Sequence, residues 1–229
     1  ARFLPVKKLV DLIVSLDFGE SIRKDGELIA TRVESKKGLK QEELHEFFNS
    51  LLGRKTELLG DEILELKNVW DLFKKNEQAL LIDYKEITNN KVSQKIPEGI
   101  NSIGDRIFIE EGAQLTYATL NSATGPIYIG KNTVIMEGAT IRGPFALLDE
   151  SQVKMGAKIY GATTVGPQSK VGGELNNVVI QGYSNKNHDG FLGNAVLGEW
   201  CNLGADTNNS NLKNNYAIVK SWSYRKEGF

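Results

Sequence analysis

An aliphatic residue at every sixth position is the feature that most limits the folds open to this chain. Seven consecutive steps of six lead from Ile129 to Val171, and the same spacing recurs on both sides. A helix of 3.6 residues per turn cannot keep every sixth side chain on one face, and a single strand would alternate. Short strands joined by tight turns satisfy the pattern. Its positions are Ile103, Ile109, Leu115, Ile129, Ile135, Ile141, Leu147, Val153, Ile159, Val165, Val171, Phe191, Leu197 and Leu203.

Small residues fall four positions after most of these aliphatic residues, as at Ala139, Ala157 and Ser169. Three such hexads make one coil of a triangular solenoid, with the large side chains stacked inward and the small ones at the corners. The period is interrupted at 120–128 and at 175–190. Interruptions in a solenoid commonly form loops that carry function. We therefore expect a mainly β fold, a parallel β-helix over residues 99–229, with two such loops.

The residues before the repeat divide into two zones, 1–33 and 34–98. The first has an apolar segment at 9–14, a turn signal at Asp25-Gly26 and a strand-like segment at 27–30, and it is too short to bury a core alone. We expect it to be the edge of a larger unit. In the second zone, apolar residues at helical spacing over 44–52 predict one helix, and a second is expected from Asn68, with Asn68 as its N-cap.

The composition excludes several classes of partner. The 229 residues include 28 basic and 29 acidic ones, so there is no electrostatic case for nucleic acid or a membrane surface as the main partner. The one cysteine, Cys201, rules out an internal disulfide framework and a cysteine-based zinc site, and favours a reducing compartment, the cytoplasm. No apolar run approaches a membrane span of about 20 residues, and no cluster of metal ligands is evident.

One of the two histidines, His188, falls in the second interruption, where its ordinary pKa suits proton transfer near neutrality. By composition alone, a loop histidine is more often merely solvated. After His188 the sequence continues with Leu192-Gly193-Asn194-Ala195, Leu197-Gly198, Asn202, Leu203-Gly204-Ala205-Asp206-Thr207 and Asn211-Leu212, and Gly143-Pro144-Phe145-Ala146 lies upstream.

These motifs resemble the acetyltransferase domain of the bifunctional N-acetylglucosamine-1-phosphate uridyltransferase/glucosamine-1-phosphate N-acetyltransferase family, over roughly residues 103–216. The opening Arg2-Phe3-Leu4-Pro5 looks like the tail of a sugar nucleotidyltransferase domain. The likeness is therefore closest to bacterial putative sugar nucleotidyltransferases with a fused hexapeptide-repeat domain. It implies a β-helix that is left-handed, a handedness taken from the resemblance, preceded by a small helical region and a remnant of an α/β nucleotidyltransferase domain.

The resemblance also implies a function, N-acetylation of glucosamine 1-phosphate by acetyl-CoA in UDP-N-acetylglucosamine biosynthesis, in a homotrimer. His188 then takes the place of the family's general base. The implied sugar-binding positions are Asn202, Phe191, Asn176 and Lys186, and the implied acetyl-CoA positions are Ala205, Asn211 and Leu212. The family's β-helix continues for several coils beyond this point, so we expect this chain to be truncated at its C-terminus.

Some family positions are changed, and they leave an alternative open. A tyrosine is Phe191 here, an arginine is Asp149 and a lysine is Asn176, so two cations that hold a sugar phosphate are missing. Arg142, Lys154, Lys158 or Lys186 would have to replace their charge-assisted bonds. The alternative is a sugar-1-phosphate nucleotidyltransferase whose β-helix is an oligomerising or regulatory platform. That reaction would need Mg and a complete nucleotidyltransferase domain, and residues 1–33 contain no glycine-rich phosphate loop.

Overall fold

The structure, a computed structural model, describes residues 3–24, 26–33, 43, 63–209, 212–220, 222–223 and 227–229. The chain forms two compact units, residues 1–67 and 68–229, and each is described here by itself. The domain limits 1–33, 34–98 and 99–229 remain predictions. The helix expected over 44–52 lies outside the described residues.

The first unit holds a helix and a hairpin. Helix α1 spans Lys7–Val14, so the apolar segment is helical, and strands β1 (Ser21–Lys24) and β2 (Glu27–Thr31) pair antiparallel. The turn between them contains Gly26 at φ 82°, a conformation that favours glycine. This confirms the predicted turn and strand. A small buried cluster of Leu9, Leu16, Ile22 and Ile63 joins the pieces.

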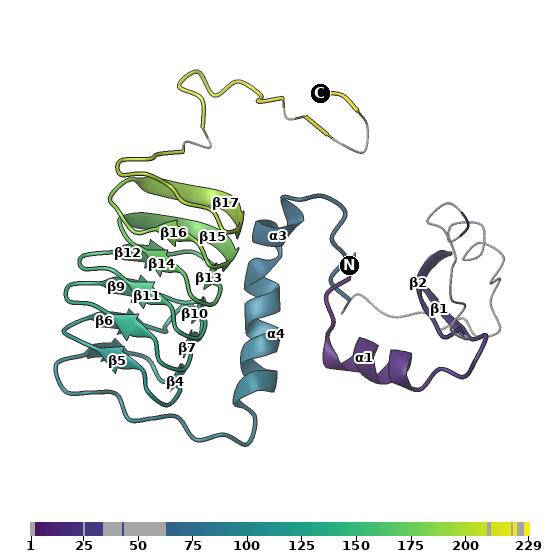
Figure 1. Cartoon of the computed structure of the whole chain (residues 1–229), viewed down its shortest axis with the longest axis horizontal. Coiled ribbons are helices and arrows are strands. Elements are labelled where there is room, and N and C mark those ends of the chain that lie inside the picture. The colour runs from purple at the N-terminus through teal and green to yellow at the C-terminus, as the bar shows by residue number, and fades with distance from the viewer. Residues whose placement is uncertain are drawn as a thin grey trace. The chain divides into compact units, whose positions relative to one another are not determined.

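The second unit is a solenoid of about six parallel coils with three faces, which confirms the predicted fold class and is consistent with a left-handed β-helix (Figure 1). The first face has β3 (Asn101–Ile103), β6 (Thr119–Asn121), β9 (Thr140–Arg142) and β12 (Lys158–Tyr160). The second has β4 (Ile107–Ile109), β7 (Ile127–Ile129), β10 (Phe145–Leu147) and β13 (Thr163–Val165). The third has β5 (Gln114–Leu115), β8 (Val134–Ile135), β11 (Gln152–Val153), β14 (Lys170–Val171) and β16 (Asn185–Lys186).

Two longer strands complete the upper coils. Strands β15 (Glu174–Gly182) and β17 (Phe191–Glu199) each run along the first face and continue onto the second. The interruption expected as a loop over 175–190 is therefore mostly strand. The repeat of six fails there because the coil from Lys158 to its partner Glu174 advances 16 residues, where the coil before it, from Thr140 to Lys158, advances 18. The first interruption does contain an extra segment, at 122–126 between β6 and β7.

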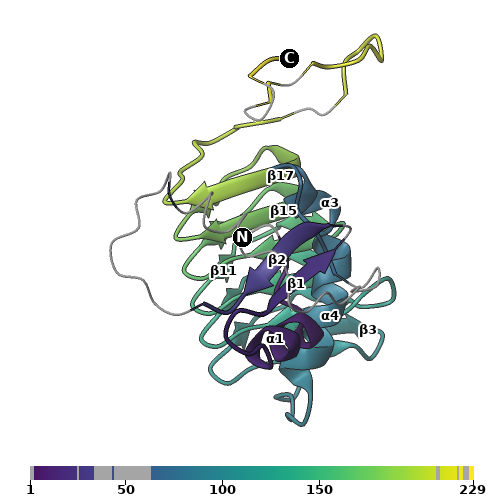
Figure 2. The ribbon, with the colours of Figure 1, turned by 90° about the vertical axis from the view of Figure 1, so that its right-hand side faces the viewer.

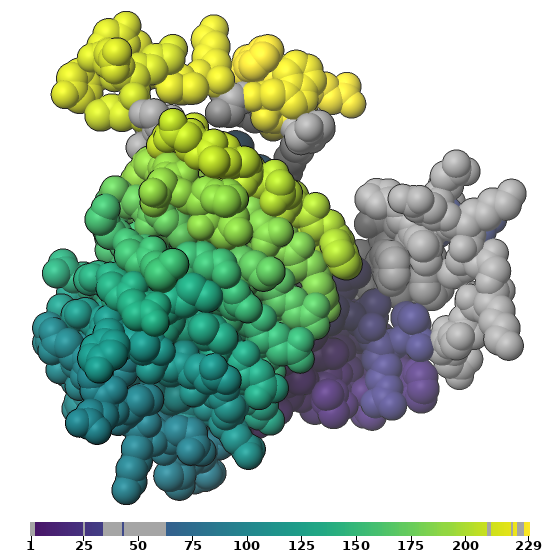
Figure 3. All heavy atoms as spheres, turned by 60° about the vertical axis from the view of Figure 1, so that its left-hand side comes forward, coloured from purple at the N-terminus to yellow at the C-terminus, as the bar shows by residue number. Residues whose placement is uncertain are grey.

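The core is the inward ladder that the spacing of six predicted. The ladder residues from Ile129 to Val171 are at most 2% exposed. Two predicted members are not in it. Ile103 is 45% exposed, and Phe191 pairs with Glu174 on the outer side of the first face, so that the next residue, Leu192, is the buried one. Figure 3 shows the coils packed directly on one another in the order of the sequence.

The corner between the second and third faces is built from left-handed residues, one per coil. Asn132, Glu150, Gln168, Tyr183 and Trp200 all have φ between 50° and 61° there. A left-handed conformation costs a non-glycine residue about 1–2 kcal/mol. The last two side chains stack on each other, with ring centroids 5.2 Å apart and planes 8° apart.

Two helices precede the coils, α3 (Asp71–Lys74) and α4 (Asn76–Thr88). Helix α4 lies along the second face (Figure 1), and Figure 2 shows α3 at the end of the coils that holds β15 and β17. Leu80 of α4 packs with Ala146 and Ala162. Asn68 is not the N-cap that was predicted, because no capping bond comes from its side chain. Instead, its backbone N–H donates to the Asp71 carboxylate at 2.9 Å.

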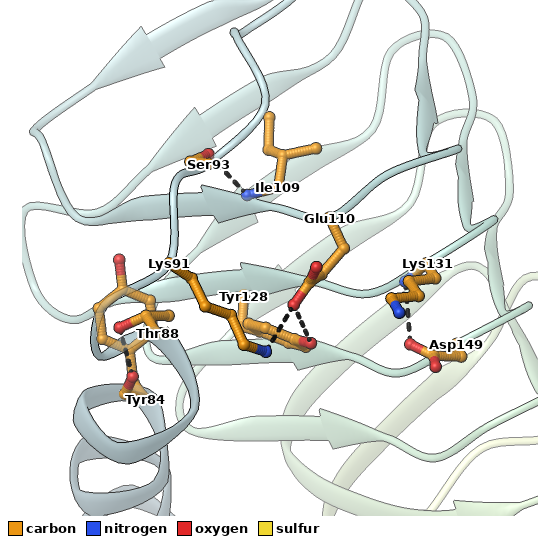
Figure 4. Close-up of polar contacts among 9 residues, drawn as sticks. All are labelled: Tyr84, Thr88, Lys91, Ser93, Ile109, Glu110, Tyr128, Lys131 and Asp149. Carbon is orange, nitrogen blue, oxygen red and sulfur yellow. Dashed lines mark hydrogen bonds and ion pairs between the residues drawn. The ribbon is translucent and has the colours of Figure 1, made fainter.

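The chain beyond α4 is fastened to the first coils by a small polar cluster. Glu110 Oε1 accepts a hydrogen bond from the Tyr128 hydroxyl at 3.1 Å and lies 3.3 Å from Lys91 Nζ (Figure 4). Burial, with the nearby Glu110 carboxylate, raises the pKa of Tyr128. Tyr128 therefore stays a neutral donor over the ordinary pH range. Within the described part of the chain, no helix is long and apolar enough to cross a membrane.

Candidate functional site

His188 lies in the short turn between β16 and β17, at the corner where the third face passes into the first. The backbone of this turn is bound from the neighbouring coils. Glu174 N donates to the Gly190 carbonyl at 3.1 Å, and Asp206 N donates to the Asp189 carbonyl at 3.0 Å. The His188 side chain is exposed. The turn thus presents an imidazole to solvent on a backbone held by two coils.

Lys186 has a different place from the substrate-binding one expected for it. Its side chain points into the solenoid and is 1% exposed, and Nζ donates to the carbonyl of Gly172 at 3.1 Å and of His188 at 2.6 Å. Burial lowers the pKa of Lys186, and the charge of Asp189 acts in the opposite direction. A buried ammonium with two carbonyl partners is not available to a sugar phosphate at the surface.

Asn176 and Phe191 both belong to the outer side of the first face, next to the His188 corner. Asn176 pairs with Tyr160 in the coil below and with Gly193 in the coil above. A Cβ on Gly193 would lie 2.5 Å from the Phe191 ring, so the ring covers this glycine. The upper first face therefore offers an amide and an aromatic ring beside His188.

Tyr160 is a polar residue of this face that the motif comparison did not single out. Its hydroxyl donates to Glu174 Oε1 at 2.5 Å, and this hydrogen bond is the main cause that raises the pKa of Tyr160. The side chain is 37% exposed. Its position immediately after the ladder residue Ile159 is the signal that could have placed it outward, next to Asn176.

The remaining predicted residues lie in the coil that follows the His188 turn or beyond it. Asn202 is exposed and forms a parallel bridge with Asn185, three residues before His188. Ala205 is exposed and precedes Asp206, whose N–H binds the His188 turn. Leu212 is 59% exposed, and Asn211 lies outside the described residues.

Asn208 and Asn209, which sequence reasoning left to a structural role, bind the backbone of β17. Asn208 Oδ1 accepts from Phe191 N at 2.7 Å. The Asn209 side chain accepts from Gly193 N at 2.8 Å and donates to Gly193 O at 2.9 Å. Both asparagines therefore hold the first-face end of β17 in place.

The cations named as replacements for the missing phosphate ligands are distributed unevenly. Arg142 and Lys158 are exposed on the first face, whereas Lys154 follows β11 and donates to Gln152 Oε1 at 2.8 Å. Asp149, at the family's arginine position, accepts from Lys131 N of the coil below at 2.9 Å and so joins two adjacent coils (Figure 4). Among the residues that the structure describes, no three or more His, Cys, Asp or Glu side chains gather as a metal site.

Comparison with known families adds one match. Residues 1–92 match the sugar nucleotidyl transferase family, which supports the likeness expected for the N-terminal part of the chain. No curated protein matches the chain. The family match and the β-solenoid together fit a hexapeptide-repeat sugar transferase, and they support a sugar-modifying transferase.

Proposed function

We propose that the β-helix is an N-acetyltransferase that moves the acetyl group of acetyl-CoA to the amino group of an amino sugar phosphate, with glucosamine 1-phosphate as the first substrate to test. The proposal rests chiefly on the His188 turn, whose side chain is exposed while its backbone is bound by neighbouring coils. Its support from sequence is the unbroken spacing from His188 to Asn202, Ala205 and Asn211. The reducing compartment favoured by the single cysteine is proposed as the cytoplasm.

The reaction needs one proton to be removed. The amine nitrogen attacks the thioester carbonyl carbon, and His188 accepts the proton that the nitrogen loses. The carbon–sulfur bond then breaks, and His188 returns that proton to the leaving sulfur, which is released as CoA thiol. General base catalysis of this kind contributes on the order of 10²–10⁴-fold in rate. Backbone N–H groups near Ala205 are candidates to stabilise the oxyanion of the tetrahedral intermediate.

The first face supplies the side chains suited to the sugar phosphate. Arg142 and Lys158 are exposed there and carry the positive charge that Asp149 and Asn176 do not. Charge-assisted bonds from such cations to a phosphate are about twice as strong as neutral ones. Lys186 has no part in this contact, because its ammonium is buried.

A homotrimer is part of the proposal. Within residues 68–229, helix α4 packs on the second face, and the edge between the third and first faces lies opposite to it. His188 lies at that edge. An acyl-CoA bound between two copies would then contact His188 of one copy and the Ala205 region of the other.

The experiment is an acetyl-CoA thiol-release assay with glucosamine 1-phosphate on the full-length protein. The His188→Ala variant should lose at least about 100-fold in kcat. The His45→Ala variant, which removes the other histidine, should retain activity. A folded His188→Ala protein with full activity would exclude His188 as the base.

A second candidate is favoured by the N-terminal match and by Asp149, whose carboxylate binds the backbone of the coil below at the position where the family has a cation. In this alternative the β-helix only assembles or regulates a sugar nucleotidyl transferase. The full-length protein would then form a nucleotide sugar from a nucleoside triphosphate and a sugar 1-phosphate with Mg, and would show no thiol release with amino sugar phosphates.

A further inference from the structure

The inward ladder of the third face contains one residue that does not belong to an apolar core. Its members, coil by coil, are Leu115, Ile135, Val153, Val171, Lys186 and Leu203, as the pairing of the third-face strands shows. Five are aliphatic and one is lysine. Burial of an ammonium carries a desolvation penalty that an aliphatic side chain at the same place would not. Packing alone therefore gives no reason for Lys186.

The contacts of the ammonium point to the turn that follows. Nζ donates to the Gly172 carbonyl in the coil below and to the His188 carbonyl two residues ahead, at 3.1 Å and 2.6 Å. Lys186 O in turn accepts from Gly172 N at 2.7 Å. The ammonium thus links the His188 carbonyl to Gly172, the residue that follows β14, and Gly172 is itself hydrogen bonded to the backbone of Lys186.

The coil below is shaped to let this turn approach. A Cβ on Gly172 would lie 2.3 Å from the Asn187 carbonyl oxygen, and one on Gly173 would lie 2.9 Å from the His188 carbonyl oxygen. Side chains at either glycine would push the turn away. The two glycines and the lysine therefore act on the same few backbone atoms around His188.

We propose that Lys186 is a positioning residue, which fixes from inside the solenoid the backbone that carries the His188 imidazole. This inference rests on the proposed acetyl transfer for its catalytic meaning, and on the contacts of Nζ for its structural one. The charged group that acts on the ammonium is the carboxylate of Asp189, in the same turn. Nζ of Lys186 donates directly to the His188 carbonyl, at 2.6 Å.

The test removes the ammonium of Lys186 while keeping a side chain of similar volume. Lys186→Met, with Lys186→Leu as a second variant, makes the ladder apolar throughout, so the melting temperature should stay equal or rise. The kcat of acetyl transfer should fall at least about tenfold, with the KM of acetyl-CoA and of the sugar phosphate within about twofold. A residue with a merely structural role would lower the melting temperature and leave kcat of the folded protein unchanged.

A matched control variant distinguishes an effect on the His188 turn from a general effect on the core. Val153→Ala alters the same ladder two coils below, and it should lower the melting temperature and leave kcat unchanged. Backbone hydrogen exchange over residues 187–190 should accelerate in Lys186→Met and stay unchanged in Val153→Ala.

The two proposals can fail separately. If the wild-type protein shows no acetyl transfer, the proposed function fails, and hydrogen exchange still decides whether Lys186 fixes the turn. Unchanged exchange in both Lys186 variants would overturn the positioning role, whatever the activity.

Discussion

The hydroxyl of Thr164, on the outer side of the second face, donates a 2.9 Å hydrogen bond to the side-chain oxygen of Asn76. Asn76 is the first residue of α4 and is buried, and its side-chain nitrogen donates to the Ala162 carbonyl at 2.8 Å. The coils thus provide hydrogen-bond partners for both the oxygen and the nitrogen of the Asn76 side-chain amide. Because Asn76 begins the helix, this pair sets where α4 starts on the second face.

Replacing this amide should weaken the attachment of α4. Asn76→Ala leaves the Thr164 hydroxyl and the Ala162 carbonyl without these partners, which costs about 1–3 kcal/mol. Urea denaturation measures the free energy of unfolding. The control is Glu77→Ala at the adjacent, exposed position, which should change it by less than about 0.5 kcal/mol. Equal effects of the two substitutions would show that the bond does not anchor the helix.

A cation of the first face should govern affinity for the sugar phosphate. Lys158→Ala removes a charge next to the Tyr160 and Asn176 region, and we expect the KM of the sugar phosphate to rise about tenfold with kcat unchanged. Lys170→Ala is the matched control, since Lys170 also begins a strand and is exposed, but on the third face. Steady-state kinetics decide. An equal KM in wild type and Lys158→Ala would remove Lys158 from the substrate site.

The stability cost of Lys186 should depend on pH. Its folded-state pKa lies below the ordinary value of 10.5, because burial disfavours the charged form. Between the folded pKa and 10.5, the unfolded chain holds more protons at this lysine than the folded chain does. The contribution of this lysine to the free energy of unfolding therefore rises with pH in this range. The free energy of unfolding of wild type relative to Lys186→Met should therefore rise in alkaline solution. A difference that stays constant in denaturation series up to that pH would contradict the depressed pKa.

The stacked pair Tyr183 and Trp200 should show a measurable coupling. Each residue holds a left-handed conformation, with φ of 50° and 57°, that favours glycine or asparagine. The rings stack at 5.2 Å, an arrangement worth about 0.5–1.5 kcal/mol beyond burial. In a double-mutant cycle with Tyr183→Asn and Trp200→Asn, the coupling free energy should fall in that range. Strictly additive substitutions would mean that the stack contributes nothing.

The central coils were predictable from sequence because each of their three faces needs one inward aliphatic side chain per coil, six residues apart. The rule failed where coil length changes, and it placed Phe191 inside where Leu192 is buried. It also passed over Lys186, because a search for aliphatic residues rejects a lysine whose ammonium finds its partners in the backbone.

The candidate site was predictable only as a set of positions. The motif spacing singled out His188 and Asn202 as candidate positions, but it could not show that Tyr160 donates to Glu174, two residues from Asn176. The packing of α4 on the second face was equally unpredictable from the sequence. Leu80 meets Ala146 and Ala162 more than 60 positions along the chain, and no local pattern encodes such a contact.

Strands β15 and β17 are in register along their whole length, from Glu174 opposite Phe191 to Gly182 opposite Glu199. They round the corner without a break, and the side-chain amides of Asn177 and Asn194 are hydrogen bonded at 2.7 Å there. These two coils are thus joined by one continuous parallel pairing over both faces, and not by a separate short strand pair on each face. Because each coil of a solenoid is stabilised by its neighbours, this continuous pairing makes the first-face and second-face parts of the two coils that flank the His188 turn one cooperative unit, which should open together.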